Sequence, residues 1–90
     1  MVWRVAFTGK SAKQVKKMPQ REQQRLAALV RDLQITGPVQ SSWPNYSKLG
    51  KNEYHCHLSY RWVACWKLNG NELELIEIYY AGSRENAPYG

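Results

Sequence analysis

The chain has 90 residues, is 43% hydrophobic and 12% aromatic, and carries a formal net charge of +6. This length suits a single domain, 1–90, and the apolar share excludes an intrinsically disordered chain. No apolar run reaches the roughly 20 residues that cross a bilayer, and the first residues lack the apolar stretch of a signal peptide. We therefore expect a cytoplasmic protein that does not associate with membranes.

A strand and a short helix are predicted at the start of the chain. Residues 2–7 alternate between two faces as a strand does. Ser11 is the predicted N-cap of a helix that continues to about Lys17. In that helix Ala12 and Val15 are expected to face inward, while the lysines face solvent or a partner.

A longer helix is predicted at residues 20–35, because apolar residues recur there at the spacing of one helix face. These residues are Leu26, Leu29, Val30 and Leu33. Gly37-Pro38 is expected to end the helix. Residues 37–52 are predicted to form a loop, in which Trp43 and Tyr46 attach the chain to the body of the domain.

Three strands are predicted to follow, at 53–59, 61–68 and 72–80. Asn69-Gly70 indicates a two-residue hairpin turn between the last two strands. The order is then β-α-α-β-β-β, which predicts an α+β fold with a helix hairpin packed on a small, mostly antiparallel sheet.

Positive charge is concentrated in the first half of the chain. Residues 1–51 carry ten basic and two acidic side chains, a balance of +8, whereas residues 52–90 have a balance of −2. Neutralising a polyanion releases counterions, so this distribution favours RNA binding over a surface that only keeps the protein soluble. The candidate RNA-binding residues are Lys10, Lys13, Lys16, Lys17, Arg21, Lys48 and Lys51.

Two histidines form the centre of the candidate site. Strand alternation places His55 and His57 on one face and Cys56 on the other. Imidazole titrates near neutrality, so the pair can act as acid or base. They could also be surface histidines without a role, or metal ligands together with Cys56 or Cys65. The opposite direction of Cys56 argues against the metal site, and both cysteines are expected to be buried free thiols.

Two arginines and a tyrosine complete the candidate catalytic set. Arg61 follows the histidine strand, and Arg84 and Tyr89 follow the last strand, with Pro88 stiffening the chain before the tyrosine. Guanidinium groups stabilise phosphoryl charge through bidentate contacts. No acidic cluster for a catalytic metal accompanies them, so we predict a ribonuclease that uses no metal and no cofactor.

These motifs resemble those of the RelE/ParE toxin superfamily, and most closely its small cytotoxic translational repressor branch. The similarity covers nearly the whole chain. It is carried by Lys48-Leu49, Tyr54-His55-Cys56-His57-Leu58, Val63-Ala64-Cys65-Trp66, Ile76-Glu77-Ile78-Tyr79-Tyr80-Ala81-Gly82 and Arg84-Glu85-Asn86-Ala87-Pro88-Tyr89.

The resemblance implies a RelE-like microbial ribonuclease fold and the toxin of a type II toxin–antitoxin module. RelE-type members cleave mRNA in the ribosomal A site without a metal: the 2′-hydroxyl attacks the adjacent phosphate and leaves a 2′,3′-cyclic phosphate and a 5′-hydroxyl. The implied partners are a cognate antitoxin, the ribosome and mRNA.

The resemblance also implies roles for five residues. His55 and His57 match a catalytic pair on the second strand of the family, and Arg61 matches a later arginine. Arg84 and Tyr89 match a basic residue and an aromatic residue near the C-terminus. His55 is preferred as the base that accepts the 2′-hydroxyl proton, while the others stabilise charge or orient a nucleobase.

Two other functions remain open at this point. ParE-like members of the same fold inhibit DNA gyrase by binding it and do not act as nucleases. A degenerate toxin that serves only as a binding module is the other alternative. The fold alone does not choose among them.

Overall fold

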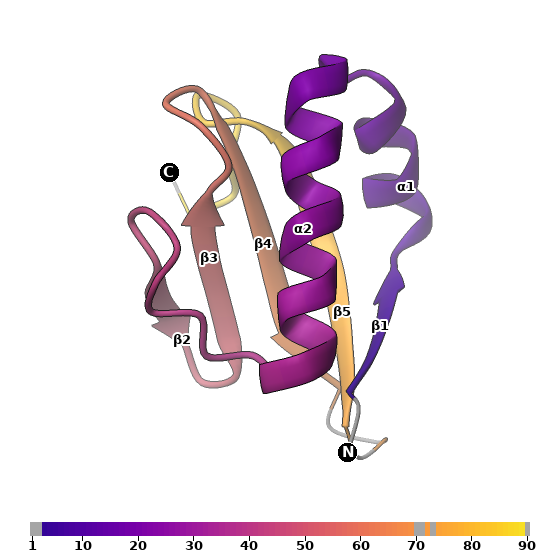
Figure 1. Ribbon diagram of the computed structural model, residues 1–90, viewed down its shortest axis with the longest axis vertical. Coiled ribbons are helices and arrows are strands. Elements are labelled where there is room, and N and C mark those ends of the chain that lie inside the picture. Colours follow the sequence, from indigo (N-terminus) through magenta and orange to yellow (C-terminus); the bar gives the residue numbers. More distant parts are fainter. Residues whose placement is uncertain (1–2, 70–71, 73, 90) are drawn as a thin grey trace.

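The computed structural model describes residues 3–69, 72 and 74–89. They form two helices and a five-stranded sheet (Figure 1). The elements in chain order are β1 (Arg4–Phe7), α1 (Gly9–Lys16), α2 (Gln20–Thr36), β2 (Ser47–Gly50), β3 (Glu53–His57), β4 (Trp62–Leu68) and β5 (Leu75–Ser83). Within the described residues, neither helix is both long and apolar enough to cross a bilayer.

The sheet has the strand order β1-β5-β4-β3-β2. β1 pairs with β5 in parallel, and the other neighbouring pairs are antiparallel. Both helices cover the same face, as Figure 1 shows. The predicted α+β fold, with a helix hairpin on a mostly antiparallel sheet, is confirmed. The predicted element order was incomplete, because the loop expected at 37–52 contains the edge strand β2.

The cap of α1 differs from the prediction. The N-cap is Thr8, whose side chain accepts a hydrogen bond from the Ser11 backbone N–H. Ser11 is fully buried, and its hydroxyl donates to the Ile78 carbonyl at 2.6 Å. This inward serine rotates the helix so that Ala12 is exposed, contrary to expectation, while Val15 packs against the core.

The apolar face of α2 is the one predicted: Leu26, Leu29 and Leu33 are buried and Val30 packs beside them. The helix ends at Gly37, which has a φ of 89°. A side chain there would also collide with the indole of Trp3, since a Cβ atom would lie 2.9 Å from it. Both the left-handed backbone conformation and the lack of room for a side chain therefore require glycine at this position.

Aromatic rings attach the segment after α2 to the core, as predicted for Trp43 and Tyr46. The Trp43 indole donates to the Asp32 carboxylate at 2.8 Å. The rings of Tyr46, Tyr54 and Trp66 stack on one another with centroids 6.2–6.3 Å apart. Trp66 is fully buried and its indole N–H donates to the Pro38 carbonyl, which joins β4 to the segment after α2.

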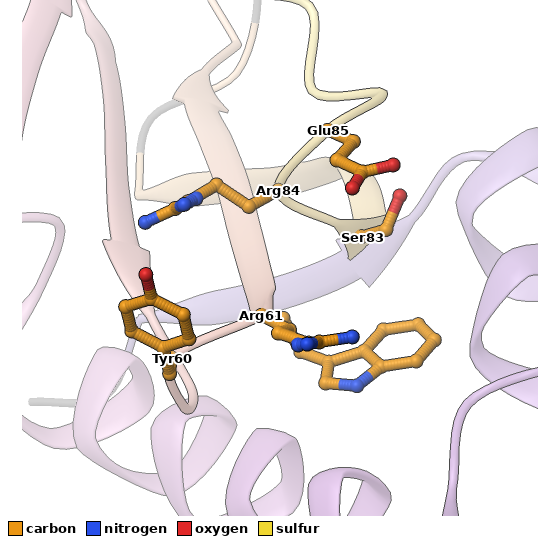
Figure 2. Close-up of a pocket in the computed structure, with 6 residues that line it drawn as sticks. Tyr60, Arg61, Ser83, Arg84 and Glu85 are labelled. Atoms are coloured by element: carbon orange, nitrogen blue, oxygen red, sulfur yellow. The ribbon is translucent and has the colours of Figure 1, made fainter.

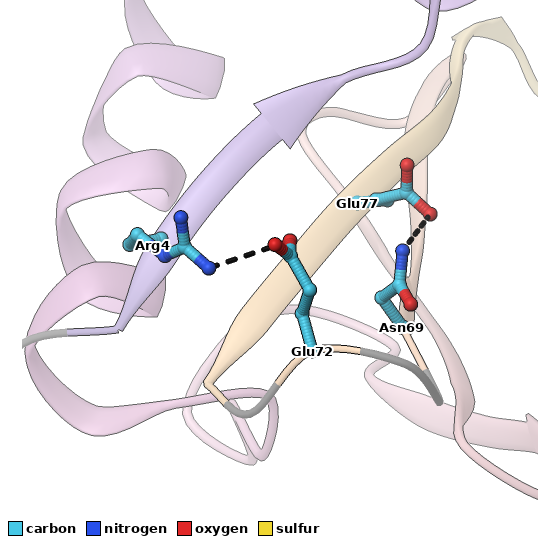
Figure 3. A network of polar contacts seen from close by, with 4 residues as sticks. All are labelled: Arg4, Asn69, Glu72 and Glu77. Atoms are coloured by element: carbon cyan, nitrogen blue, oxygen red, sulfur yellow. Dashed lines mark hydrogen bonds and ion pairs between the residues drawn. The ribbon is translucent and has the colours of Figure 1, made fainter.

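The connection between β4 and β5 is longer than a two-residue turn, because β4 ends at Leu68 and β5 begins at Leu75. Gly70 of the predicted Asn69-Gly70 turn lies outside the described residues. Figure 3 shows polar contacts at this end of the sheet: Arg4 pairs with Glu72 at 3.3 Å, and the Asn69 amide donates to Glu77 at 3.5 Å.

A β-bulge in β5 changes which face its side chains occupy. Cys65 pairs with Tyr80 and Trp66 pairs with Ile78, so Tyr79 is the extra residue. Ile78 lies on the helix side of the sheet, whereas both Tyr79 and Tyr80 pack on the opposite side. The bulge therefore brings two adjacent tyrosines to the face that the helices leave open.

Candidate active site

The two histidines lie on the open face of the sheet. Strand β3 alternates as predicted: Tyr54 and Cys56 belong to the core under the helices, while His55 and His57 point the other way. The imidazole ring centroids are 5.9 Å apart. Both residues are buried, with exposures of 7% and 8%, so they are not ordinary surface histidines.

Each imidazole is held by a residue just before or within β2. The Ser47 hydroxyl lies 3.0 Å from Nδ1 of His55, and the Asn45 amide nitrogen lies 3.3 Å from Nδ1 of His57. An amide nitrogen can only donate, so the neutral His57 ring carries its proton on Nε2. The Ser47 hydroxyl can accept from Nδ1–H, which leaves Nε2 of His55 with a free lone pair.

The pKa of both histidines is lowered below the usual value of 6.5. For His55 the main cause is burial, followed by repulsion from His57, while a hydrogen bond with the Ser47 backbone opposes the shift. For His57 the causes are burial and the positive charge of Arg84. Both imidazoles are therefore neutral at pH 7, the state in which imidazole accepts a proton.

The C-terminal segment folds back over the histidine strand. The Tyr89 ring lies against His55, with centroids 4.2 Å apart and planes inclined by 44°. Ala87 anchors the segment, because it is buried in a small cluster with Val63, Cys65 and Tyr80. Tyr89 itself remains 37% exposed, so one part of its ring is open to a ligand.

The two arginines lie at the β3–β4 connection and at the end of β5. The Arg84 guanidinium lies over the Tyr60 ring, 4.7 Å from its centroid, and the Arg84 backbone N–H donates to the Arg61 carbonyl at 2.7 Å. Figure 2 shows Arg84 extending toward Tyr60 and Arg61 extending in another direction. The charge of Arg84 reaches His57, whereas Arg61 lines a separate hollow with Tyr60 and Arg84.

A second hollow, of about 480 Å³, opens beside His55 and Tyr89. Its lining includes Glu53 and Tyr79, and the Tyr79 hydroxyl donates to the Glu53 carboxylate at 3.2 Å. Burial raises the pKa of the Tyr79 hydroxyl, and Glu53 contributes to that shift. This hollow is open space lined in part by His55.

The cysteines are buried free thiols, as predicted. Burial raises the pKa of Cys56 and of Cys65 to about 12, so both stay protonated. Cys56 lies on the helix side of the sheet and Cys65 lies on the histidine side. Among the residues that the structure describes, no group of three or more His, Cys, Asp or Glu side chains is arranged to hold a metal ion.

The predicted RNA-binding residues are exposed but fall into two groups. Lys10, Lys13 and Lys17 line a hollow of about 580 Å³ along α1, with Lys16 on the same helix and Arg21 in the first turn of α2. Lys48 and Lys51 lie in and just after β2, at the edge of the sheet farthest from β1. The basic residues of the first half of the chain therefore form two separate regions on the folded protein.

Sequence reasoning missed Asn45, Ser47 and Tyr60. Asn45 has a φ of 53°, a left-handed conformation that asparagine adopts more readily than most residues. That preference indicates a turn in the segment but carries no information about His57. Tyr60 directly precedes Arg61, and nothing in the local pattern predicts that its ring supports Arg84 instead.

No protein-family model and no curated protein sequence matches the chain. Solved structures do match it. RelE from the RelE–RelB complex of the archaeon Pyrococcus horikoshii OT3 is 16% identical, with a TM-score of 0.73 over 97% of this chain and 100% of that one. The fold is that of the RelE-type toxins.

Other RelE-type structures agree with this assignment. A mutant of the E. coli toxin RelE in the free state is 12% identical, with a TM-score of 0.76 over 99% of this chain and 90% of that one. YafQ from the E. coli DinJ–YafQ toxin–antitoxin complex is 17% identical, with a TM-score of 0.65 over 94% and 96%. Because these identities are low, the likeness establishes the fold, and the roles of individual residues must be argued from this chain.

Proposed function

We propose that this protein is the toxin of a type II toxin–antitoxin module and represses translation as a ribosome-dependent mRNA endonuclease. The observation that carries the proposal is the buried pair of neutral imidazoles, with a tyrosine ring on one member and an arginine charge reaching the other. This set supplies a base, a hydrogen-bond donor and a cation within one RelE-type fold.

His55 is the base in this mechanism. Its Nδ1 is engaged by Ser47, so Nε2 is the free acceptor for the proton of the attacking 2′-hydroxyl. The 2′-oxygen forms its bond to phosphorus as the bond from phosphorus to the 5′-oxygen breaks, and the leaving 5′-oxygen takes up a proton from solvent. The products are a 2′,3′-cyclic phosphate and a 5′-hydroxyl, and no metal is required.

The remaining residues stabilise charge and orient the RNA. His57 presents Nε2–H as a hydrogen-bond donor to the phosphoryl oxygens, because Asn45 occupies its other nitrogen. Arg84, whose charge reaches His57, offsets the negative charge that develops on those oxygens, and Arg61 adds positive charge from the adjoining hollow. Tyr89 stacks on a nucleobase and orients it, while its ring rests on His55.

The two basic regions are the proposed contacts with the ribosome. Phosphates of ribosomal RNA would be neutralised on one side by Lys10, Lys13, Lys16, Lys17 and Arg21, and on the other side by Lys48 and Lys51.

Antitoxin complexes of RelE and YafQ are among the matching structures. We infer that a cognate antitoxin neutralises this chain as well and that the protein acts in the cytoplasm.

Inducible expression followed by primer-extension mapping of cellular transcripts tests the proposal. New 5′ ends inside coding sequences are expected within minutes of induction, and a His55→Ala/His57→Ala variant at equal abundance should produce none. Growth arrest without transcript cuts but with loss of DNA supercoiling would instead indicate a gyrase inhibitor. Neither cuts nor arrest would indicate a binding module.

A further inference from the structure

A hollow of about 370 Å³ lies at the end of the sheet where β4 begins and β5 ends, and its lining includes Arg84, whose charge reaches His57. Its lining is Tyr60, Arg61, Trp62, Ser83, Arg84 and Glu85 (Figure 2). Tyr60 is 73% exposed, a large fraction for an aromatic side chain in a folded domain. Exposed aromatic rings between basic groups are typical of single-stranded nucleic-acid sites, where bases stack on the rings.

The walls of this hollow are held in a fixed arrangement. The backbone hydrogen bond from Arg84 N–H to the Arg61 carbonyl joins the C-terminal segment to the β3–β4 connection. The Arg25 guanidinium in α2 donates to the Leu58 carbonyl at 2.9 Å and holds that connection against the helix. These bonds position the backbone of both segments, and the Arg84 guanidinium lies over the Tyr60 ring.

Charge in the hollow is available to an anion. Throughout the part of the chain that the structure describes, the one ion pair is that of Arg4 with Glu72, at the opposite end of the sheet. Among these described residues, no carboxylate lies within ion-pair distance of Arg61 or Arg84, although Glu85 lines the same hollow. A guanidinium group that makes no ion pair can bind the phosphate of a nucleotide, and an exposed aromatic ring can stack on its base.

We propose that this hollow is a nucleotide subsite for single-stranded RNA, in which a nucleobase extends the stack of Arg84 and Tyr60 and the attached phosphate contacts Arg61. The subsite rests on the proposed endonuclease function and names the substrate contact next to the cleaved bond. A neighbouring hollow of about 330 Å³ shares Trp62 and Ser83 and continues to Lys10 and Lys17. That hollow provides a path for the following phosphates.

Binding of a fully 2′-O-methylated, fluorescein-labelled hexaribonucleotide, which has no free 2′-hydroxyl to attack, tests the subsite. Anisotropy titrations at several salt concentrations should show that Tyr60→Ala weakens binding about tenfold and leaves the salt slope unchanged, because it removes a stacking surface. Tyr60→Trp should restore affinity. Arg61→Ala should reduce the slope by about 0.7, the share of one single-strand phosphate contact.

Ile35→Ala is the control, because Ile35 is an exposed apolar side chain at the far end of α2. Its affinity and slope should equal those of the unchanged protein. If the affinity of Tyr60→Ala and the salt slope of Arg61→Ala both equal those of the control, the subsite proposal is wrong. Cleavage by the unchanged protein on mRNA-programmed ribosomes is measured in parallel. Intact oligonucleotide binding without cuts would refute the endonuclease alone. Cuts together with a Tyr60→Ala affinity and an Arg61→Ala slope that both match the control would refute the subsite alone.

Discussion

At the scale of single residues, the site depends on differences between two similar histidines. Both are buried on one face of β3, yet Nδ1 of His55 faces a hydroxyl, which can accept a hydrogen bond, while Nδ1 of His57 faces the Asn45 amide nitrogen, which can only donate. This asymmetry gives the pair complementary proton positions. Strand alternation predicted their common face from sequence, because that pattern depends only on backbone geometry. The partners that set their tautomers come from a segment without a periodic pattern, and sequence could not predict them.

His55→Ala should lower the rate of transcript cleavage about 10²-fold or more, because it removes the proposed general base. His57→Ala should also reduce the rate, through loss of a hydrogen bond to the phosphate. Single-turnover cleavage on programmed ribosomes measures both effects. Circular dichroism of each variant controls for folding. Full activity of the double alanine variant would remove the histidines from the mechanism.

The lowered pKa of both histidines predicts how stability depends on pH. Above about 6.5 the imidazoles are neutral in the folded and unfolded chains, so they add no pH dependence. Below 6.5 the unfolded chain binds protons that the folded protein resists, so stability should fall as pH falls. Urea denaturation at pH 5.0–8.0 measures this. His55→Asn/His57→Asn should flatten the curve, and an equally steep curve in that variant would assign the effect to other groups.

At the scale of elements, the bulge in β5 and the C-terminal segment complete the site. The bulge places Tyr79 and Tyr80 on the open face, and Ala87 packs beside Tyr80, which directs Tyr89 onto His55. The bounds of α2, β3 and β4 were predicted to within two residues, because their apolar spacing is regular, whereas β5 begins and ends three residues later than predicted. The edge strand β2 was not predicted, since its sequence Ser47–Gly50 is short and half polar and its pairing with β3 is irregular.

Tyr89→Ala should reduce cleavage while Tyr89→Phe retains most of it, because the ring stacks on a base and its hydroxyl has no assigned role. A loss of about tenfold is expected for one stacking contact. Single-turnover cleavage with excess protein measures the change. Ala87 remains in both variants, so the anchoring of the segment is unchanged. Equal losses in alanine and phenylalanine variants would instead implicate the hydroxyl group.

At the scale of the whole molecule, basic charge surrounds the site on two sides. One group lies along α1 and the start of α2, and the other lies at the β2 edge. Composition predicted a polyanionic partner, because a balance of +8 in residues 1–51 is visible without a fold. The separation into two regions depends on strand order, and strand order is not visible in the sequence.

Reversing Lys13, Lys16 and Lys17 to glutamate should weaken ribosome binding and flatten its salt dependence. Each lost phosphate contact removes about one unit of slope, so the triple variant should lose at most about three. Sedimentation with ribosomes at several salt concentrations measures this. The hexaribonucleotide should still bind this variant through the Tyr60 hollow, but more weakly, because Lys17 lines the proposed path of its following phosphates. A slope unchanged by the reversal would assign these lysines to solubility alone.

The most direct test of the central claim is cleavage of a defined mRNA by purified protein on programmed ribosomes, with both new ends identified chemically. The account predicts cuts in the ribosomal A site only when ribosomes are present. The upstream fragment should carry a 2′,3′-cyclic phosphate and the downstream fragment a 5′-hydroxyl. 1,10-Phenanthroline, which removes transition metals and leaves ribosomal Mg²⁺ in place, should not change the rate. Intact mRNA at protein concentrations that arrest growth, or cleavage that phenanthroline abolishes and zinc restores, would contradict the account.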